Sequence, residues 1–144
     1  MSSISFIVAL IAGLAAVIQS TFNAIMVKQI GFAGAAFLVG IGSSLFSGIM
    51  LLGVSGWNLT GFTQLPLYVI LGAGLAGVAI IGGVGFLVST LGVAGGLSFF
   101  IIIQLVLSVI FDHFGIFVSP RIPADPVKIA GLVLMIVGFH LVLR

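Results

Sequence analysis

The feature that most constrains this chain is a stretch of 83 consecutive residues, from Gln29 to Phe111, without a single formally charged side chain. A water-facing surface cannot be built over such a length, because soluble domains carry about 25% charged residues. Of the 144 residues in the whole chain, only 4% are charged and 62% are hydrophobic. This imbalance predicts a protein of the lipid bilayer.

The apolar runs are expected to be helices, because a backbone in hydrocarbon must satisfy its hydrogen bonds internally and a helical span takes about 20 residues. Five runs fit, and we expect them to form one all-α, polytopic transmembrane domain over residues 1–144. Their approximate ranges are Ile4 to Val27, Phe32 to Val54, Pro66 to Ser89, Val93 to Phe111 and Pro126 to Leu143.

The breaks between these runs carry ordinary helix-ending and helix-starting signals. We expect the first run to end in the segment Lys28 to Gly31. Leu91 and Gly92 leave room only for a tight turn. Asp125 followed by Pro126 is typical of an N-cap and a first helical position, and predicts the start of the last helix.

Positive charges are split evenly between the two membrane faces that five spans imply. Arg121 and Lys128 fall on the face of the N-terminus, and Lys28 and Arg144 fall on the other. Since Lys and Arg near span ends set orientation, this tie favours neither insertion. We therefore expect dual topology and an antiparallel homodimer of ten helices, related by a two-fold axis in the membrane plane. In the alternative reading the tie is chance, or the N-terminal amine breaks it.

Polar side chains inside the expected spans are costly, so they indicate where function lies. Gln19 and Asn23 lie four residues apart, and Gln104, Ser108 and Asp112 repeat that spacing, which places each group on one helix face. We expect Gln19, Asn23, Gln104 and Ser108 to line a cavity and to offer a small-molecule substrate uncharged donors and acceptors. The alternative is that they form hydrogen bonds between helices.

Small residues form a second pattern, with Ala36, Gly40, Ser44 and Gly48 also four apart. Such a ridge is typical of close helix packing, which we predict for it. The run from Pro66 to Ser89 holds six glycines at membrane depth, and these either let the helix bend or form a groove for its neighbours. Phe99, Phe100 and Phe111 are candidates to line an apolar pocket beside the polar stripe.

Asp112 stands near the end of its helix, where a carboxylate meets the negative pole of the macrodipole at a cost of about 0.3–1 kcal/mol. A cation is expected to compensate it, and Arg121 or Lys128 could form the ion pair. A role for Asp112 and the adjacent His113 in coupling or gating is the other interpretation.

Several function classes are excluded or disfavoured by composition. The chain has no cysteine and no glutamate, and its two His and two Asp residues do not show metal-ligand spacing. Catalysis, a metal and a cofactor are therefore not expected. The pI of about 9.7 comes from a net charge of only +2 without a basic patch, so nucleic acid is not an expected partner.

With these residues in view, the chain resembles the YdcZ-like family of small bacterial inner-membrane proteins, a five-span branch of the drug/metabolite transporter superfamily. The Gln104 to Gly115 segment is the most specific match, because it carries the family's glutamine, serine and Asp-His-Phe-Gly pattern. The other matching positions are Gln19 to Asn23, Ala36 to Gly40, Leu91 to Ala94, and Gly131 with Gly138 in the last run.

The resemblance implies a transporter fold made of two five-helix halves, which occur in this family as single, paired or fused chains. It implies export of a small organic solute by alternating access across the inner membrane, with self or a paired homologous chain as partner. Gly131 and Gly138 become further packing positions. The more distant small multidrug resistance exporters place a glutamate in the first helix; here Gln19 and Asn23 are the polar groups, which favours an uncharged substrate. A dual-topology ion channel and an accessory subunit of a larger transporter are the alternatives.

Overall fold

The computed structural model describes residues 3–55, 64–116 and 121–144. Within these ranges the chain forms three helices and no strand: α1 (Ser3–Ser55), α2 (Leu67–Phe114) and α3 (Pro126–Val142). The predicted all-α class is confirmed. By length and composition, α1 and α2 are long and apolar enough to cross a membrane, whereas α3 is a shorter apolar helix.

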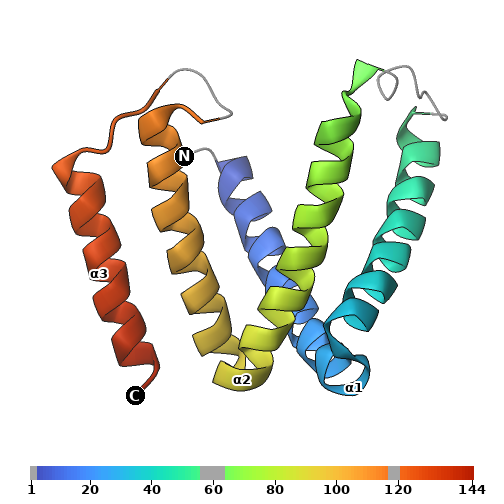
Figure 1. The fold of residues 1–144 in the computed structure, drawn as a ribbon, viewed down its shortest axis with the longest axis horizontal. Helices are drawn as coiled ribbons and strands as arrows, with labels where there is room; N and C mark the ends of the chain where they lie inside the picture. Colours follow the sequence, from blue (N-terminus) through green and yellow to red (C-terminus); the bar gives the residue numbers. More distant parts are fainter. Residues whose placement is uncertain (1–2, 56–63, 117–120) are drawn as a thin grey trace.

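Both long helices reverse direction at one glycine. The backbone of Gly31 lies at φ 74°, ψ 174°, and that of Gly92 at φ 75°, ψ 171°, a region that is essentially open to glycine alone. Each helix therefore consists of two arms, residues 3–30 and 32–55 in α1 and residues 67–91 and 93–114 in α2. Figure 1 shows the two hairpins, with both glycine turns at its lower end.

The two turns share a sequence pattern, which was not used to place the expected span boundaries. Residues 30–35 read Ile-Gly-Phe-Ala-Gly-Ala, and residues 91–96 read Leu-Gly-Val-Ala-Gly-Gly. In both, small residues follow the first residue of the returning arm, at positions 33–35 and 94–96, and these let the arm lie close to the one before it. The first arm of α1 stays helical through Lys28 and Gln29 to Ile30, so it ends within the expected segment Lys28 to Gly31, and one glycine suffices for the reversal.

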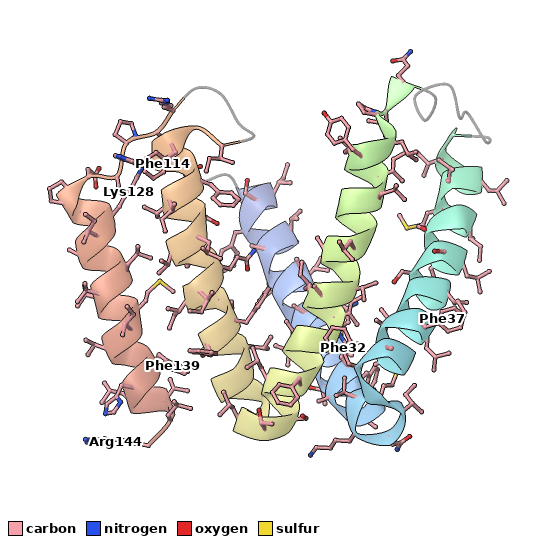
Figure 2. All side chains as sticks on the ribbon, in the orientation of Figure 1. Phe32, Phe37, Phe114, Lys128, Phe139 and Arg144 are labelled. Atoms are coloured by element: carbon pink, nitrogen blue, oxygen red, sulfur yellow. The ribbon has the colours of Figure 1, made fainter. Side chains whose placement is uncertain are left out.

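The helices pack around α2, which contacts both α1 and α3, while α1 and α3 do not contact each other in the described chain. The interior is small: Ala24, Val84 and Val88 form its buried centre, and partly buried Val93, Leu97 and Phe100 pack against it. Most large apolar side chains are exposed, including Phe37 at 68%. In Figure 2 such side chains project outward along the helices, as they do in a protein surrounded by lipid tails.

The connection between α2 and α3 has well-defined ends. The α2 helix stops at Gly115, which has φ 68° and donates its N–H to the carbonyl of Asp112. The predicted start of α3 is confirmed, because the Asp125 side chain accepts a 2.7 Å hydrogen bond from the Lys128 backbone N–H and Pro126 opens the helix.

Candidate functional site

Two polar side chains are buried in the described chain, Ser20 and Asn23, each 3% exposed. The Ser20 hydroxyl donates to the Val17 carbonyl at 2.9 Å within its own helix. The Oδ1 atom of Asn23 is buried and accepts no hydrogen bond, and no other buried side-chain nitrogen or oxygen in the described ranges lacks a partner. An unsatisfied buried acceptor costs about 1–3 kcal/mol, so Asn23 marks a place where a donor is missing.

Asn23 faces a cavity of about 140 Å³ between α1 and both arms of α2. The first arm of α1 contributes small and polar residues to its wall, and α2 contributes only apolar ones. The lining residues are Ala16, Gln19, Ser20 and Asn23 from α1, and Ile80, Ile81, Val84, Leu97 and Phe100 from α2. None of them is ionisable, so the cavity offers hydrogen bonds and apolar contact but no charge.

Glycines on α2 bring the walls of this cavity together. A Cβ atom on Gly85 would lie 2.7 Å from Cγ2 of Val27 and 3.1 Å from the Asn23 carbonyl oxygen, so only glycine lets α1 approach so closely. A Cβ atom on Gly96 would lie 2.6 Å from the Val88 backbone nitrogen, where the two arms of α2 meet. Of these two, Gly85 belongs to the glycine-rich run, and its contact supports the packing-groove interpretation for that part of the run. The arm itself stays helical, since the non-helical residue of α2 is Gly92.

The expected substrate-binding residues divide into two groups. Gln19 and Asn23 line the cavity together, whereas Gln104 and Ser108 are exposed and lie outside its wall. The Ser108 hydroxyl donates to the Gln104 carbonyl at 2.8 Å, within its own helix. No hydrogen bond found among the described residues links any of these four side chains to another helix, which removes the alternative of inter-helix bonding within the chain.

The helical spacing of Gln104 nevertheless places it on the same face of α2 as two residues that line the cavity. It follows Phe100 by four residues and Leu97 by seven, so its position continues the face of α2 that walls the cavity. Twelve residues separate Gln19 from Gly31, and twelve separate Gln104 from Gly92. At 1.5 Å per residue, both glutamines lie about 18 Å along their helices from the turns. The side-chain amides of Gln19 and Gln104 therefore lie at the same distance along their helices from the two turns.

One polar lining residue, Ser20, was not singled out from the sequence. Ser20 follows Ala16 by four residues and precedes Asn23 by three, so the stripe that indicated Gln19 and Asn23 includes it as well. Of the three phenylalanines considered for an apolar pocket, Phe100 lines this cavity. Phe99 instead stacks on Phe139 of α3, with ring centroids 5.5 Å apart. Phe139 is labelled in Figure 2.

Asp112 and His113 lie at the far end of α2 from the glycine turns. Nδ1 of His113 accepts a 3.2 Å hydrogen bond from the Ala124 backbone N–H, and the Asp112 carbonyl accepts one of 3.0 Å from Ile122. Both bonds attach the connection before α3 to the end of α2. Twenty residues separate Asp112 from Gly92, or about 30 Å of helix, so neither residue is near the cavity.

The expected ion pair of Asp112 is wrong for the described chain, where its carboxylate pairs with neither Arg121 nor Lys128. Backbone N–H groups of Gly115, Ile116 and Ile122 already satisfy the carbonyls that end α2, which weakens the negative pole without a cation. The Lys128 ammonium group donates to the Pro123 carbonyl at 3.3 Å instead.

The ridge of Ala36, Gly40, Ser44 and Gly48 does not pack closely inside this chain beyond its first member. Ala36 is 4% exposed, but a Cβ atom on Gly40 or Gly48 would meet no atom within 4 Å. The first three ridge residues border an open apolar groove of about 750 Å³, shared with Phe37, Leu45 and Val78 among others. Close packing of this ridge stays a prediction, and its partner must come from outside the described chain.

The two glycines expected to pack in α3 are also open, because a Cβ atom on Gly131 or Gly138 would meet nothing within 4 Å. Gly138 borders a third cavity, of about 330 Å³, between α2 and α3 with Met135 and Phe139. Their packing role stays a prediction as well.

Comparison with known proteins finds one family whose model matches this sequence. The model of the family described as "Putative inner membrane exporter, YdcZ" matches residues 4–141, nearly the whole chain. No curated protein and no solved structure matched.

Proposed function

The chain belongs to the YdcZ family and lies in the inner membrane, and from that premise we propose that it exports a small uncharged organic solute by alternating access. In this proposal two copies with opposite orientations form the carrier. The observation that carries it is the cavity between α1 and α2, which has no ionisable group and holds the unpaired acceptor of Asn23. A solute that supplies a donor would satisfy that acceptor.

Five crossings of the membrane are the first part of the proposal. The four arms of α1 and α2 contain 22 to 28 residues each, as their bounds and the turn glycines define them. At 1.5 Å per residue they extend about 33–42 Å, enough for a hydrocarbon core of about 30 Å. The 17 residues of α3 extend about 26 Å, which is sufficient with slight thinning of the bilayer.

The charge distribution supports insertion in both orientations. Lys128 and Arg144 lie at opposite ends of α3 in Figure 2. Arg121 lies in the connection before α3, on the side of Lys128. Lys28 is three residues from the Gly31 turn, which lies on the side of the C-terminal Arg144. Because each end carries two cations, the positive-inside rule favours neither orientation, and both are accessible.

The depth of the polar residues supports a shared site. Gln19 and Gln104 lie about 18 Å from the turns, close to the middle of a hydrocarbon core of about 30 Å. A two-fold axis in the membrane plane passes through that depth and brings mid-depth residues of both copies together. We propose that Gln104 and Ser108, exposed in one chain, face the second copy there and complete a substrate site with Gln19 and Asn23.

The remaining expected positions have roles in this arrangement. We propose that the ridge of Ala36, Gly40, Ser44 and Gly48 packs against the second copy, because its groove is open and its glycines have free space. Asp112 and His113, where the connection to α3 is attached, would act in coupling or gating at the rim rather than in binding.

Topology is the decisive test of the dual arrangement. The chain has no native cysteine, so Ser2→Cys and Leu143→Cys variants, which keep all four cations, can each be labelled in intact cells with a membrane-impermeant maleimide. We expect about half of the molecules to be labelled at either position. Complete labelling at one terminus and none at the other would contradict the inverted pair and indicate a single orientation with a separate partner.

Transport itself is tested by osmotic swelling, which needs no knowledge of the substrate. Proteoliposomes facing a gradient of an uncharged alcohol or amide shrink and then re-swell as solute enters, and stopped-flow light scattering records the rate. A carrier gives rates that saturate with solute and fall in Asn23→Leu. Rates proportional to concentration, or single-channel currents, would instead support a channel. Solute entry no faster than in protein-free vesicles, across the whole panel, would favour an accessory subunit.

A further inference from the structure

We infer that the cavity between α1 and α2 binds an uncharged, ring-sized group bearing one hydroxyl or N–H donor, which it donates to Oδ1 of Asn23. The inference rests on the proposed function in that this group would be the recognised part of the exported solute. Binding to the cavity does not itself require transport or a particular orientation of the chain, so the two ideas can fail separately.

The need for an external donor follows from the local hydrogen bonds. Oδ1 of Asn23 is buried without a partner, and the nearest hydroxyl along the same face, that of Ser20, is committed to the Val17 carbonyl at 2.9 Å. The α2 residues that line the cavity have only aliphatic or aromatic side chains, so they bring no side-chain donor. Gln19 carries the remaining side-chain N–H donor of the lining, and it makes no hydrogen bond to this oxygen. A buried polar atom in a native protein normally has a partner, which a ligand can supply here.

The size of the ligand follows from the volume and the walls. The cavity measures about 140 Å³ and has five apolar residues on its α2 side, among them Val84, Leu97 and Phe100. Apolar protein cavities of about 150 Å³ admit one benzene molecule. A single six-membered ring, or an aliphatic group of that volume, therefore fills the space, while a fused two-ring system does not fit without movement of the helices.

The charge of the ligand follows from what the lining lacks. None of the nine lining residues can carry a charge, and an ion without a counter-charge is strongly disfavoured at this depth. The site therefore rejects ammonium and carboxylate groups and accepts neutral ones. Phenols and ring-sized alcohols or secondary amides combine the three required properties of size, neutrality and one donor.

Binding is tested with three fluorinated rings of similar size that differ in their donor. The full-length protein is placed in phosphatidylcholine nanodiscs, and ¹⁹F NMR follows 4-fluorophenol, 4-fluoroanisole and 4-fluorotoluene. Displacement by excess unlabelled phenol separates a saturable site from partition into lipid. We expect saturable binding of 4-fluorophenol, with about tenfold weaker binding of the two rings that cannot donate, as the loss of one hydrogen bond predicts.

Variants locate the site. Asn23→Leu should weaken 4-fluorophenol binding about tenfold and abolish the preference over 4-fluoroanisole. The same amide-to-leucine change at exposed Gln29, near the Gly31 turn and away from the cavity lining, should leave both unchanged. Val84→Phe fills the cavity without removing the acceptor and should abolish saturable binding of all three rings.

Three results would overturn the inference: equal affinity for the three rings, no displaceable binding of any ring to folded wild-type protein, or a donor preference that survives Asn23→Leu. The ring series on wild-type protein decides the matter even if Asn23→Leu does not fold. Donor-selective binding together with one-sided labelling of the termini would refute the inverted pair but not the site. Half labelling without ring binding would do the reverse.

Discussion

Two surfaces of this protein are built from small residues, yet only one of them is filled. On α2, Gly82, Gly85 and Gly96 stand where a neighbour already occupies the place of a Cβ atom. On α1, the ridge has the more regular spacing, but Gly40 and Gly48 have no atom within 4 Å of that place. The comparison teaches that a small-residue pattern indicates the capacity for close approach and does not say which surface, or which molecule, approaches.

The largest expected effect separates the two surfaces directly. In Gly96→Ala the new methyl group meets the Val88 backbone nitrogen and Cα at 2.6 and 2.7 Å, and a backbone cannot rotate away. We expect the free energy of unfolding to fall by about 3 kcal/mol, the upper range for overpacking. Gly83→Ala, with nothing within 4 Å, is the matched control. Denaturation in detergent micelles, followed by circular dichroism, measures both, and equal stabilities would break the comparison.

The next effect tests a glycine that has room for a side chain but whose backbone angles disfavour one. Gly92 has no atom within 4 Å of a Cβ position, as on the ridge, but its φ of 75° and ψ of 171° disfavour any side chain. Gly92→Ala should therefore lower the free energy of unfolding by about 1–3 kcal/mol, as backbone strain predicts. Gly31→Ala should behave alike, since its turn has the same geometry. If both variants unfold like wild type, the two turns do not depend on glycine.

A smaller effect is expected where the neighbour can move. A methyl group on Gly82 would overlap the ring of Phe32, which is labelled in Figure 2 and lies at the start of the returning arm of α1. Because a side chain can rotate, Gly82→Ala should cost about 1 kcal/mol, the low end of overpacking. The second change Phe32→Leu should recover part of that loss. Additive costs in the double variant would show that the ring is not the obstacle.

The smallest effect on folding is expected on the ridge, where the change should act on the second copy instead. Gly40→Ala should leave the free energy of unfolding of one chain unchanged or raise it by up to about 1 kcal/mol, since alanine favours helix. Gly40→Leu fills the groove and should reduce the fraction of dimer captured by chemical cross-linking in membranes. An undiminished dimer fraction would mean that the pair forms through another face.

Much of the fold could be predicted because its causes are local. The uncharged stretch requires backbone hydrogen bonds within segments, which gives helices. The start of α3 depends on Asp125 and Pro126 alone, and the reversal at Gly92 depends on one residue. A break over Lys28 to Gly31 was expected as well, and the repeated pattern, Ile-Gly-Phe-Ala against Leu-Gly-Val-Ala, identifies Gly31 as the residue of the turn.

The site was predicted only in part because its causes are not local. Four-residue spacing correctly placed Gln19 and Asn23 on one face, but it carries no information on which helix that face meets. That partner depends on Gly85, which permits close approach of α1, and Gly96 brings the two arms of α2 together beside it. The ion pair of Asp112 failed for a similar reason, since backbone N–H groups arriving from Ile116 and Ile122 satisfy the helix end.

The one-residue turns at Gly31 and Gly92 also have a consequence for how the protein is made. A turn of this kind leaves no length of chain to bridge water while a single arm waits in the bilayer. In the proposed arrangement of five crossings, each hairpin is therefore expected to enter the membrane as a pair of arms, in one step. Few independent insertion events are then expected: α1 as a unit, α2 as a unit, and α3 after them.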